Sequence, residues 1–450
     1  MAELSLPSAV DFSKKLPHLP ENMTSNLATI LPNNGTTFRA GGIISWDLPA
    51  RAGLYLQGNT VFVRYKLRYT SGATATTNYI LGTPAVSPFF KLDEYVNSTP
   101  VNSVYNYNQV ANMYINTHLG LSEKYGVQSS LFSELKAGVN NMDSAGDAVQ
   151  VTASQASLAG FASLATPLYC SALIEMDKYF PTGLAGTYRI QLTLAQVSDF
   201  CLAGITDYQI ENVELCINTS DLGAGVDAMV AQMGEQIIIK STGWANAGVG
   251  QVASASTGVV SLLANHRFQS INNLYLLASG ADSAKDVNKI FDSRDITSMN
   301  GQIQFTIGSQ TYPQLPINTA VNKNSVMQYL RECTSSLTDW RYAMSINGQE
   351  FSKYLGSANT TAVNGFTPID VTTVTEPSKF IVGVPVSKVQ PMNPYAPSSL
   401  LSGVSASSTP IIANINIGTA TGQAYNVFVV AEYDVLISVD PMSRSVNVIQ

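Results

Sequence analysis

Residues 427–439 read VFVVAEYDVLISV, and this stretch decides the fold class. Every second residue from Val427 to Val439 is aliphatic or aromatic, so an extended segment has one continuous apolar face along its whole length. A period of two is typical of a β-strand with one face in a protein core. The stretch therefore predicts a long strand in a sheet that is packed on one side.

The same period recurs along the chain. It is seen in Val61–Tyr69, Tyr188–Leu194 and Ile303–Ile307, where apolar residues alternate with arginine, lysine, glutamine and threonine. Asn-Gly pairs, which have hairpin chemistry, occur at residues 34–35, 300–301, 347–348 and 364–365. Because many strands are joined by turns without regular alternation of strand and helix, the pattern predicts an all-β antiparallel sandwich or barrel.

Two short helices are expected, one in each half of the chain. The first has Asn108 as its N-cap, and the second has Ser325 as its N-cap with Gln328 completing a capping box. Their apolar stripes are Val110, Met113, Tyr114 and Thr117, and Val326, Tyr329, Leu330 and Cys333. The stripes begin at Val110 and Val326, so nearly half of the chain separates them. The strand at 431–437 similarly follows Tyr188–Leu194 by a little more than half of the chain.

The chain therefore reads as two β domains of similar plan. We expect an N-terminal arm at residues 1–38, a first β domain at 39–220 and a second at 237–450. A helical connector at residues 221–236 joins the two domains. Its helical spacing is shown by Val226, Met229, Val230 and Met233.

Charge is scarce in this chain. Hydrophobic residues make up 45% of the sequence and charged residues 12%, whereas soluble domains carry charge on about a quarter of their residues. A neutral polar surface provides weak self-repulsion, so it suits a chain whose flanks meet other protein. The net charge of −7 argues against a dedicated nucleic-acid binder, which needs a basic face. No apolar run approaches the roughly 20 residues of a membrane-spanning helix.

The N-terminal stretch MAELSLPSAVDFSKKLPHLP has prolines and charges where a signal peptide needs an unbroken apolar run. We therefore expect the chain to be made and kept in the cytosol or nucleus. The cysteines agree with such a reducing compartment, because they are scattered without a CxxC pair and are predicted to be buried thiols. They are Cys170, Cys201, Cys216 and Cys333.

No catalytic, metal-binding or cofactor-binding site is predicted. The three histidines, His18, His118 and His266, have no partners at ligand or triad spacing. His118 is interpreted as a cation favoured at a helix C-terminus. Glu175 and Asp177 lie on one face of a strand-like segment, a pairing that glycoside hydrolysis can use. A solvated or interface pair is the favoured interpretation of these two acids.

Arg64, Lys66 and Arg68 project from one strand face and form the densest basic feature. In the first interpretation these cations contact an acidic partner or nucleic acid. In the second they lie on an outward sheet face, either in solvent or paired with acids of a neighbour. The negative net charge favours the second interpretation. Residues 240–242 (Lys-Ser-Thr) lack the preceding glycine of a phosphate loop, and residues 248–250 (Gly-Val-Gly) lack a following helix. Both are expected to be sheet-edge loops.

Several short stretches occur in an order that is itself informative. In the first half they are Gly53–Leu56 with Val61–Tyr69, Pro88–Leu92 and Val104–Val110. In the second half they are Arg267–Leu277 with Phe291–Ile296, Gln304–Gly308 with Tyr312–Ile317, Phe380–Gly383 and Leu401–Val404. In this order the chain resembles the double jelly-roll major capsid proteins of the adenovirus, tailless membrane phage, virophage and polinton-like virus lineage. The resemblance extends over most of residues 40–440.

The resemblance implies an all-β fold of two consecutive eight-stranded antiparallel jelly rolls, which are β-sandwiches, with short inserted helices. It implies that the chain is a structural virion protein and not an enzyme. Homotrimers of this protein would form the pseudo-hexameric capsomers of an icosahedral shell. The implied partners are neighbouring capsomers, minor capsid or penton proteins, and a membrane or genome beneath the arm. Loops at residues 143–155 and 352–377 are expected to form outward towers and contacts between capsomers. Assembly is expected in the host cytoplasm or nucleus.

Two other classes of function compete with this one. A carbohydrate-binding or adhesive β-sandwich would need aromatic platforms and a secretory route, and the chain has three tryptophans, Trp46, Trp244 and Trp340. A hydrolase would have to use Glu175 and Asp177. The capsid protein is the preferred hypothesis because the sequence shows the expected pattern of neither alternative function.

Overall fold

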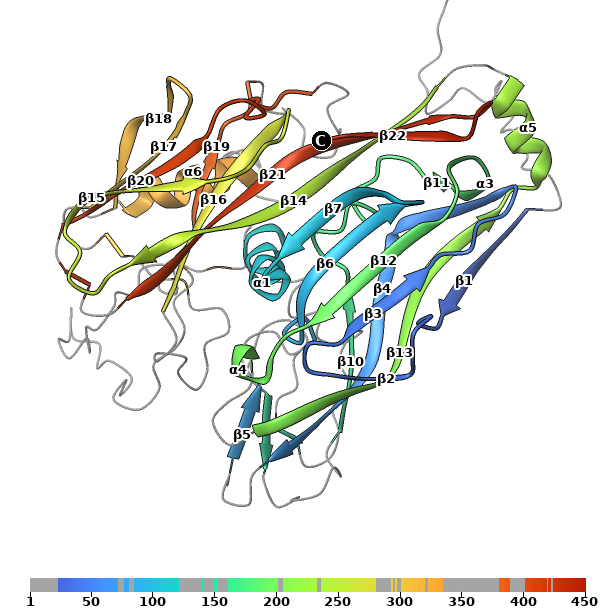
Figure 1. The fold of residues 1–450 in the computed structure, drawn as a ribbon, viewed down its shortest axis with the longest axis horizontal. Helices are drawn as coiled ribbons and strands as arrows, with labels where there is room; N and C mark the ends of the chain where they lie inside the picture. The colour runs from blue at the N-terminus through green and yellow to red at the C-terminus, as the bar shows by residue number, and fades with distance from the viewer. Residues whose placement is uncertain are drawn as a thin grey trace, which may run out of the picture.

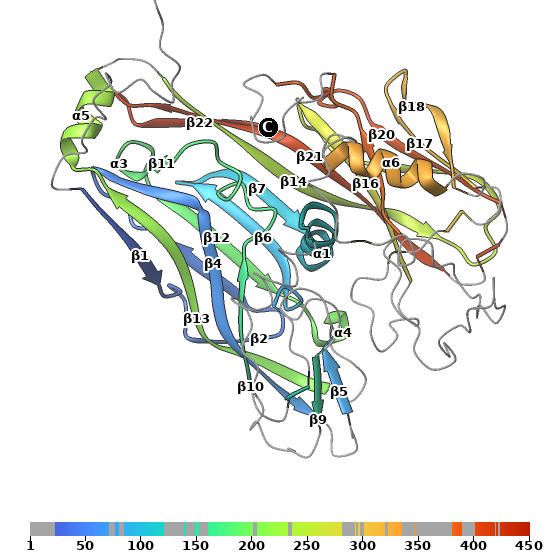
Figure 2. The same ribbon diagram turned by 180° about the vertical axis from the view of Figure 1, so that it is seen from behind.

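The computed structural model shows two β-sandwiches that are joined by the short helix α5 (Ala224–Gln232) (Figures 1 and 2). It describes residues 23–71, 77–80, 85–120, 139–140, 149–152, 161–200, 205–232, 236–280, 293, 296–297, 301–319, 323–334, 346, 380–388, 401–418, 420–421 and 424–450. No helix within these ranges is long and apolar enough to cross a membrane.

The first sandwich has a larger and a smaller sheet. The path through the larger sheet is β1 (Thr24–Ile30), β13 (Ile205–Asp221), β4 (Leu54–Ser71) and β10 (Phe161–Pro167). Two short strands extend it, β2 (Thr37–Arg39) beside β13 and β11 (Phe180–Pro181) beside β4. The smaller sheet runs β3 (Ile43–Asp47), β12 (Tyr188–Leu194), β6 (Phe89–Val96) and β7 (Thr99–Tyr105). A separate small sheet contains β5 (Thr77–Ile80), β9 (Val149–Thr152) and β8 (Val139–Asn140).

The second sandwich repeats this plan. One sheet runs β14 (Ile237–Val252), β21 (Tyr425–Asp440), β16 (Ile271–Gly280) and β19 (Val382–Pro385), with β22 (Ser445–Ile449) beside β21. The other runs β15 (Gly258–Ala264), β20 (Ile411–Ile417), β17 (Gln302–Ile307) and β18 (Gln310–Asn318).

The eight main strands of each sandwich occupy the same places when they are counted along the chain. In the first sandwich they are β1, β3, β4, β6, β7, β10, β12 and β13, and in the second they are β14 to β21. In both sandwiches one sheet has the order first, eighth, third, sixth, and the other has second, seventh, fourth, fifth. Eight strands in two packed sheets with this order form a jelly roll. The predicted pair of antiparallel jelly rolls is confirmed.

The repeat corrects one comparison made on the sequence. Tyr188–Leu194 forms β12, the seventh strand, and its counterpart is β20. The stretch at 431–437 lies in β21, whose counterpart is β13, so the expected correspondence between the two stretches compares unlike strands and is wrong. The spacing of the two helix stripes is close to the true repeat. That repeat is the distance along the chain from the start of β1 to the start of β14, and from the start of β12 to the start of β20.

The expected N-terminal arm at residues 1–38 overlaps the first sandwich. β1 pairs with β13 along its whole length, with Thr24 opposite Asp221 and Ile30 opposite Leu215. The first jelly roll therefore begins at residue 24. β1 was not recognisable as a strand because it is an edge strand with mostly exposed side chains, so it has no apolar face to alternate. Lys14, Lys15 and the rest of residues 1–22 lie outside the described residues.

Alternation of buried and exposed side chains is confirmed in the predicted strands. In β21 every second residue from Tyr425 to Val439 is buried, as the period of two predicted. β12 and β17 show the same pattern, with their apolar residues buried and the residues between them more exposed. Trp46 and Trp244, one in each sandwich, are both fully buried in the cores. The long strands are therefore held by apolar burial on their inner faces.

The inserted helices are present, but they begin earlier than expected. The first, α1, spans Tyr107–His118 and is preceded by Asn106 in the left-handed region at φ 48°, so Asn108 is inside the helix and not its cap. The second, α6, spans Lys323–Thr334, which places Ser325 in its first turn and makes the predicted capping box wrong. Both helices lie between the fifth and sixth main strands of their sandwich, which agrees with the duplicated plan.

The connector helix α5 is largely exposed, and its buried residue is not one of the apolar residues predicted to matter. Met229 is 61% exposed, whereas Asp227 is buried. The Asp227 carboxylate accepts hydrogen bonds from the Gly53 N–H at 2.7 Å and from the Tyr55 hydroxyl at 2.8 Å. This carboxylate therefore holds the connector against the first sandwich.

Candidate functional site at the seam between the two sandwiches

The two sandwiches meet along the edges of two sheets. β7 ends the smaller sheet of the first sandwich, and β14 ends a sheet of the second. The backbone N–H of Trp244 donates to the side-chain oxygen of Asn102 at 3.2 Å, and the Asn246 side chain donates to the carbonyl of Tyr105 at 3.2 Å. Each edge is thus covered by the other through bonds between side chains and backbone. We call this junction the seam.

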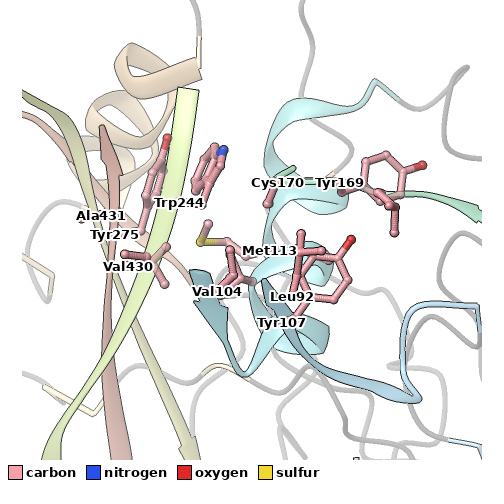
Figure 3. Packing of buried hydrophobic residues seen from close by; sticks show 14 of the residues in the cluster. Leu92, Val104, Tyr107, Met113, Tyr169, Cys170, Trp244, Tyr275, Val430 and Ala431 are labelled. Atoms are coloured by element: carbon pink, nitrogen blue, oxygen red, sulfur yellow. The ribbon is translucent and has the colours of Figure 1, made fainter. Parts of the chain in front are cut away.

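Large apolar and aromatic side chains fill the seam (Figure 3). Trp244 of β14 stacks on Tyr275 of β16 with ring centroids 5.8 Å apart, and it meets the edge of Tyr114 of α1 at 5.7 Å. Val104 and Met113, from the first sandwich, point toward this aromatic pair (Figure 3). Because these side chains are fully or largely buried, the seam is a packed core and stabilises a fixed arrangement of the two sandwiches.

Polar contacts continue on both sides of this core. Asp177 and Lys240 are joined twice, by the Asp177 N–H donating to the Lys240 carbonyl at 3.0 Å and the Lys240 N–H donating to the Asp177 carboxylate at 2.9 Å. The Ser241 hydroxyl donates to the carbonyl of Ala172. The side chain of Gln450, the last residue, donates to the carbonyl of Val101 in β7 at 2.8 Å. The second sandwich is therefore tied to the first from the start of β14 to the C-terminus.

A fully buried carboxylate organises the first sandwich beneath the seam. Glu94 of β6 accepts hydrogen bonds from Asn102 at 2.9 Å, Ser171 at 2.6 Å, the Ala172 N–H at 2.7 Å and the Tyr188 hydroxyl at 3.0 Å. Burial raises the pKa of Glu94, and these four donors oppose the rise. Since the oxygen of the same Asn102 amide accepts from the second sandwich, the Glu94 network positions the seam.

Two more acids lie at the seam, one from each sandwich. Glu175 accepts a hydrogen bond from the Tyr114 hydroxyl at 3.0 Å, and Glu432 of β21 accepts from the Asn273 amide at 2.8 Å and the Tyr275 hydroxyl at 3.0 Å. Burial raises the pKa of Glu175. Burial, reinforced by the negative charge of Glu175, raises the pKa of Glu432 to about 7. Glu432 therefore titrates near neutral pH.

His118 lies at the end of α1 in this seam and is not the cation that the sequence suggested. Its ring stacks on Tyr114 with centroids 4.5 Å apart and meets Trp244 edge-on at 5.5 Å. Burial lowers the pKa of His118 to about 3. A neutral imidazole packed among aromatic rings replaces the expected contact with the helix dipole, because desolvation outweighs the field of the helix end.

The suggested carboxylate pair is not assembled for catalysis. The segment holding Glu175 and Asp177 is a turn and not a strand, so the two side chains do not share a face. Glu175 is directed to Tyr114 inside the seam, whereas Asp177 is exposed and bonds to the backbone of Lys240. These two acids are separate parts of the interface between the sandwiches, so the expected interface location is correct but the expected pair on one strand face is not.

The basic strand face is paired with acids of a neighbouring strand. Arg64 of β4 forms an ion pair with Glu214 of β13, and Arg68 forms one with Glu211 at 2.9 Å. Lys66 lies between them, partly buried. The second interpretation of this basic face, pairing with neighbouring acids, is confirmed for the two arginines. Paired cations on a sheet face are a poor attraction for nucleic acid.

The remaining residues singled out in the sequence have structural roles or lie outside the described residues. Cys170 and Cys216 are buried free thiols, and Cys333 is a free thiol of intermediate exposure. His266 lies in a loop, bonded to the carbonyl of Val429 at 2.9 Å, and burial lowers its pKa. Residues 240–242 and 248–250 are parts of the edge strand β14 and not loops. Outside the described residues lie His18, Cys201, Trp340, the expected tower loop at 352–377 and most of the one at 143–155.

Within the described ranges no group of three or more His, Cys, Asp or Glu residues is arranged to hold a metal ion. Sequence reasoning missed Glu94 and Glu432, which accept hydrogen bonds beneath and beside the seam. A signal for Glu94 was present, because it falls on the same face of β6 as Leu92 and Val96, which are buried. A lone carboxylate at an apolar position of a strand indicates a buried, hydrogen-bonded acid.

Comparison with known proteins identifies solved structures of similar architecture. Neither a family model nor a curated protein matches the chain. Solved structures do match, over nearly the whole length. The Faustovirus major capsid protein matches with a TM-score of 0.55 at 10% identity, covering 94% of this chain and 91% of that one. The mavirus major capsid protein matches with a TM-score of 0.53 at 11% identity, covering 100% and 95%.

The PBCV-1 virus capsid matches with a TM-score of 0.53 at 12% identity, covering 97% of this chain and 99% of that one. At such low identity the likeness concerns the fold. This chain has the same double jelly-roll fold as these proteins, with matches that cover 94–100% of its length.

Proposed function

We propose that this chain is a structural virion protein, the major capsid protein of an icosahedral virus, and that three copies form a capsomer of six similar sandwiches. The observation that carries the proposal is the repeated jelly roll with identical strand order, matched over 94–100% of the chain by the capsid proteins of Faustovirus and mavirus and by the PBCV-1 virus capsid. A chain that supplies two similar lobes gives six from three copies, and a closed ring of copies is the simplest assembly.

The seam supports this proposal. A packed core, with Asn102 and Trp244 bonded across the seam and Glu94 beneath it, holds the two sandwiches as one rigid unit. Rigid units with low surface charge tile more readily, because contacts between copies then need few buried ion pairs. The proposal assigns the chain no catalytic role.

The proposed partners are neighbouring capsomers and minor capsid or penton proteins, and the proposed location is the virion. The segment before β1 would lie against a membrane or genome, and assembly would take place in the host cytoplasm or nucleus. A carbohydrate-binding function has less support, because Trp46 and Trp244 are buried and provide no sugar platform.

Native mass spectrometry of the purified full chain at micromolar concentration tests the proposal. Trimers are expected. A monodisperse monomer would contradict it, and glycan-array binding by such a monomer would favour the carbohydrate-binding alternative.

A further inference from the structure

The sheet that contains β15, β20, β17 and β18 has one face in the core of the second sandwich and one face directed outward. In β15, β20 and β17 the outward side chains form a grid, because the strand register aligns them in three rows. We call this grid the neutral face. Its rows are Val259, Asn416 and Gln302; Ser261, Asn414 and Gln304; and Leu263, Ile412 and Thr306. Figures 1 and 2 place the sheet toward the end of the molecule away from α5.

The neutral face combines bonded polar side chains with exposed apolar ones. The Ser261 hydroxyl donates to the side-chain oxygen of Asn414 at 2.7 Å, and the Asn414 amide donates to the Thr306 hydroxyl at 2.9 Å. On either side of Ser261 in β15, Val259 is 68% exposed and Leu263 is 57% exposed. None of the nine side chains of the grid is charged. Exposed apolar side chains grouped among polar ones are typical of a surface that contacts another protein.

The internal repeat provides a comparison within the same chain. The strands β3, β12 and β6 of the first sandwich are the counterparts of β15, β20 and β17. Two ion pairs lie on their outward face, Arg189 with Asp47 at 2.6 Å and Lys91 with Asp93 at 2.8 Å. The matching rows of this face are Ile43, Thr193 and Lys91; Ser45, Gln191 and Asp93; and Asp47, Arg189 and Tyr95. The lack of charge is therefore particular to the second sandwich and is not a consequence of the shared fold.

A neutral face of this kind can pack on a second copy of itself. At a contact with two-fold symmetry the same patch serves both copies, so a side chain near the axis meets its own equivalent. A lysine or a carboxylate in that position would face an identical charge, which opposes association. Amide and hydroxyl groups carry both a donor and an acceptor, so they can bond to their own equivalents. The middle row, Ser261, Asn414 and Gln304, consists of such groups.

We propose that the neutral face is the surface through which one copy of this chain packs on a second copy about a two-fold axis. This inference rests on the proposed function and concerns the contact between neighbouring capsomers. A closed ring of three copies relates its members by a three-fold axis alone, so a two-fold contact joins chains of different rings. Three strands make a small interface, so each contact is weak alone and is strengthened by the other contacts of a shell.

Cysteine cross-linking in the full chain tests this contact. Asn414→Cys places a thiol at the centre of the neutral face, and Gln191→Cys is the matched control because Gln191 occupies the same position in the first sandwich. A short bis-maleimide joins two thiols by adding one to each of its rings, and the parent chain gives the background from its own cysteines. Thiols held together by the contact have an effective concentration of about millimolar, so Asn414→Cys is expected to give about tenfold more cross-linked dimer than Gln191→Cys on a denaturing gel.

Charges added beside the reporter thiol make the test specific for two-fold symmetry. In the Asn414→Cys chain, Ser261→Asp and Ser261→Lys each place like charges on both sides of the contact, and each is expected to lower the dimer yield by about tenfold. A mixture of these two variants places opposite charges across the contact, so its yield is expected to return to that of Asn414→Cys alone. Circular dichroism verifies that every variant is folded. A mixture that gives no more dimer than either variant alone would overturn the two-fold contact.

The remaining outcomes separate this inference from the proposed function. A yield for Asn414→Cys no higher than that for Gln191→Cys would overturn the inference. Native mass spectrometry of the cross-linked protein is expected to show masses above three copies. Cross-linked chains within a mass of three copies would place the neutral face inside the ring, which overturns the inference while the proposed function stands. A monomeric parent that still gives cross-linked pairs through Asn414→Cys would contradict the proposed function and support the two-fold contact.

Discussion

Glu432 makes the stability of the seam depend on pH. Its carboxyl group accepts hydrogen bonds from Asn273 and Tyr275, and burial raises its pKa from 4.5 to about 7. A raised pKa means that the folded protein holds the proton more tightly than the unfolded chain does. The contribution of Glu432 is therefore fully present below pH 4.5 and is lost as pH rises through 7. At about 1.36 kcal/mol per pKa unit, the loss is at most about 3 kcal/mol.

Replacing Glu432 with glutamine removes this titration while keeping a side-chain oxygen for the same two donors. The Glu432→Gln variant is expected to gain stability over the parent as pH rises from 5 to 8, by up to about 3 kcal/mol. The difference between the two proteins is the useful quantity, because His118 acts in the opposite sense. Burial lowers the pKa of His118, so its contribution to stability is lost as pH falls below about 6.5.

Urea denaturation followed by tryptophan fluorescence measures this difference, since Trp244 lies in the seam. Glu214→Gln is the control, because it removes a partly exposed ion pair with Arg64 on the outer sheet face and is expected to cost less than about 1 kcal/mol. Parallel stability profiles for the parent and Glu432→Gln from pH 5 to 8 would refute the reasoning.

Three further substitutions test other parts of the structure. Asn102→Ala leaves the buried Glu94 without one donor and the second sandwich without an acceptor, so thermal unfolding should show a loss of about 2–4 kcal/mol; an unchanged midpoint would contradict the role of the seam. Asp227→Ala leaves Tyr55 and a backbone N–H without their acceptor and should cost about 1–3 kcal/mol in urea denaturation, whereas no loss would show that α5 is held otherwise. Arg64→Ala should change stability by less than about 1 kcal/mol and leave the proposed trimer intact by native mass spectrometry, and a smaller mass for this variant than for the parent would reveal a role for this arginine in assembly.

The fold was predictable from the sequence where strands have one buried face. β12, β17 and β21 keep the period of two because water lies on one side and the core on the other. β1 was missed for the converse reason, since an exposed edge strand has no reason to alternate. The starts of α1 and α6 were also missed, because local capping chemistry is weaker than the tertiary contacts that fix where a helix begins.

The seam was much less predictable than the sheets. Asn102 and Trp244 lie 142 residues apart in sequence, and no local pattern indicates that they bond. The neutral state of His118 follows from aromatic rings that three different elements bring together. Only the low content of charge, 12% of residues, pointed toward extensive contact with protein. That count is consistent with the uncharged outward face of β15, β20 and β17.

Negative-stain electron microscopy of the purified full chain, combined with its native mass, tests the central claim most directly. The particles should have three times the 48.1 kDa mass of the chain and a hexagonal outline made of six lobes. Particles of 48.1 kDa with two lobes, persisting at micromolar concentration, would contradict the account.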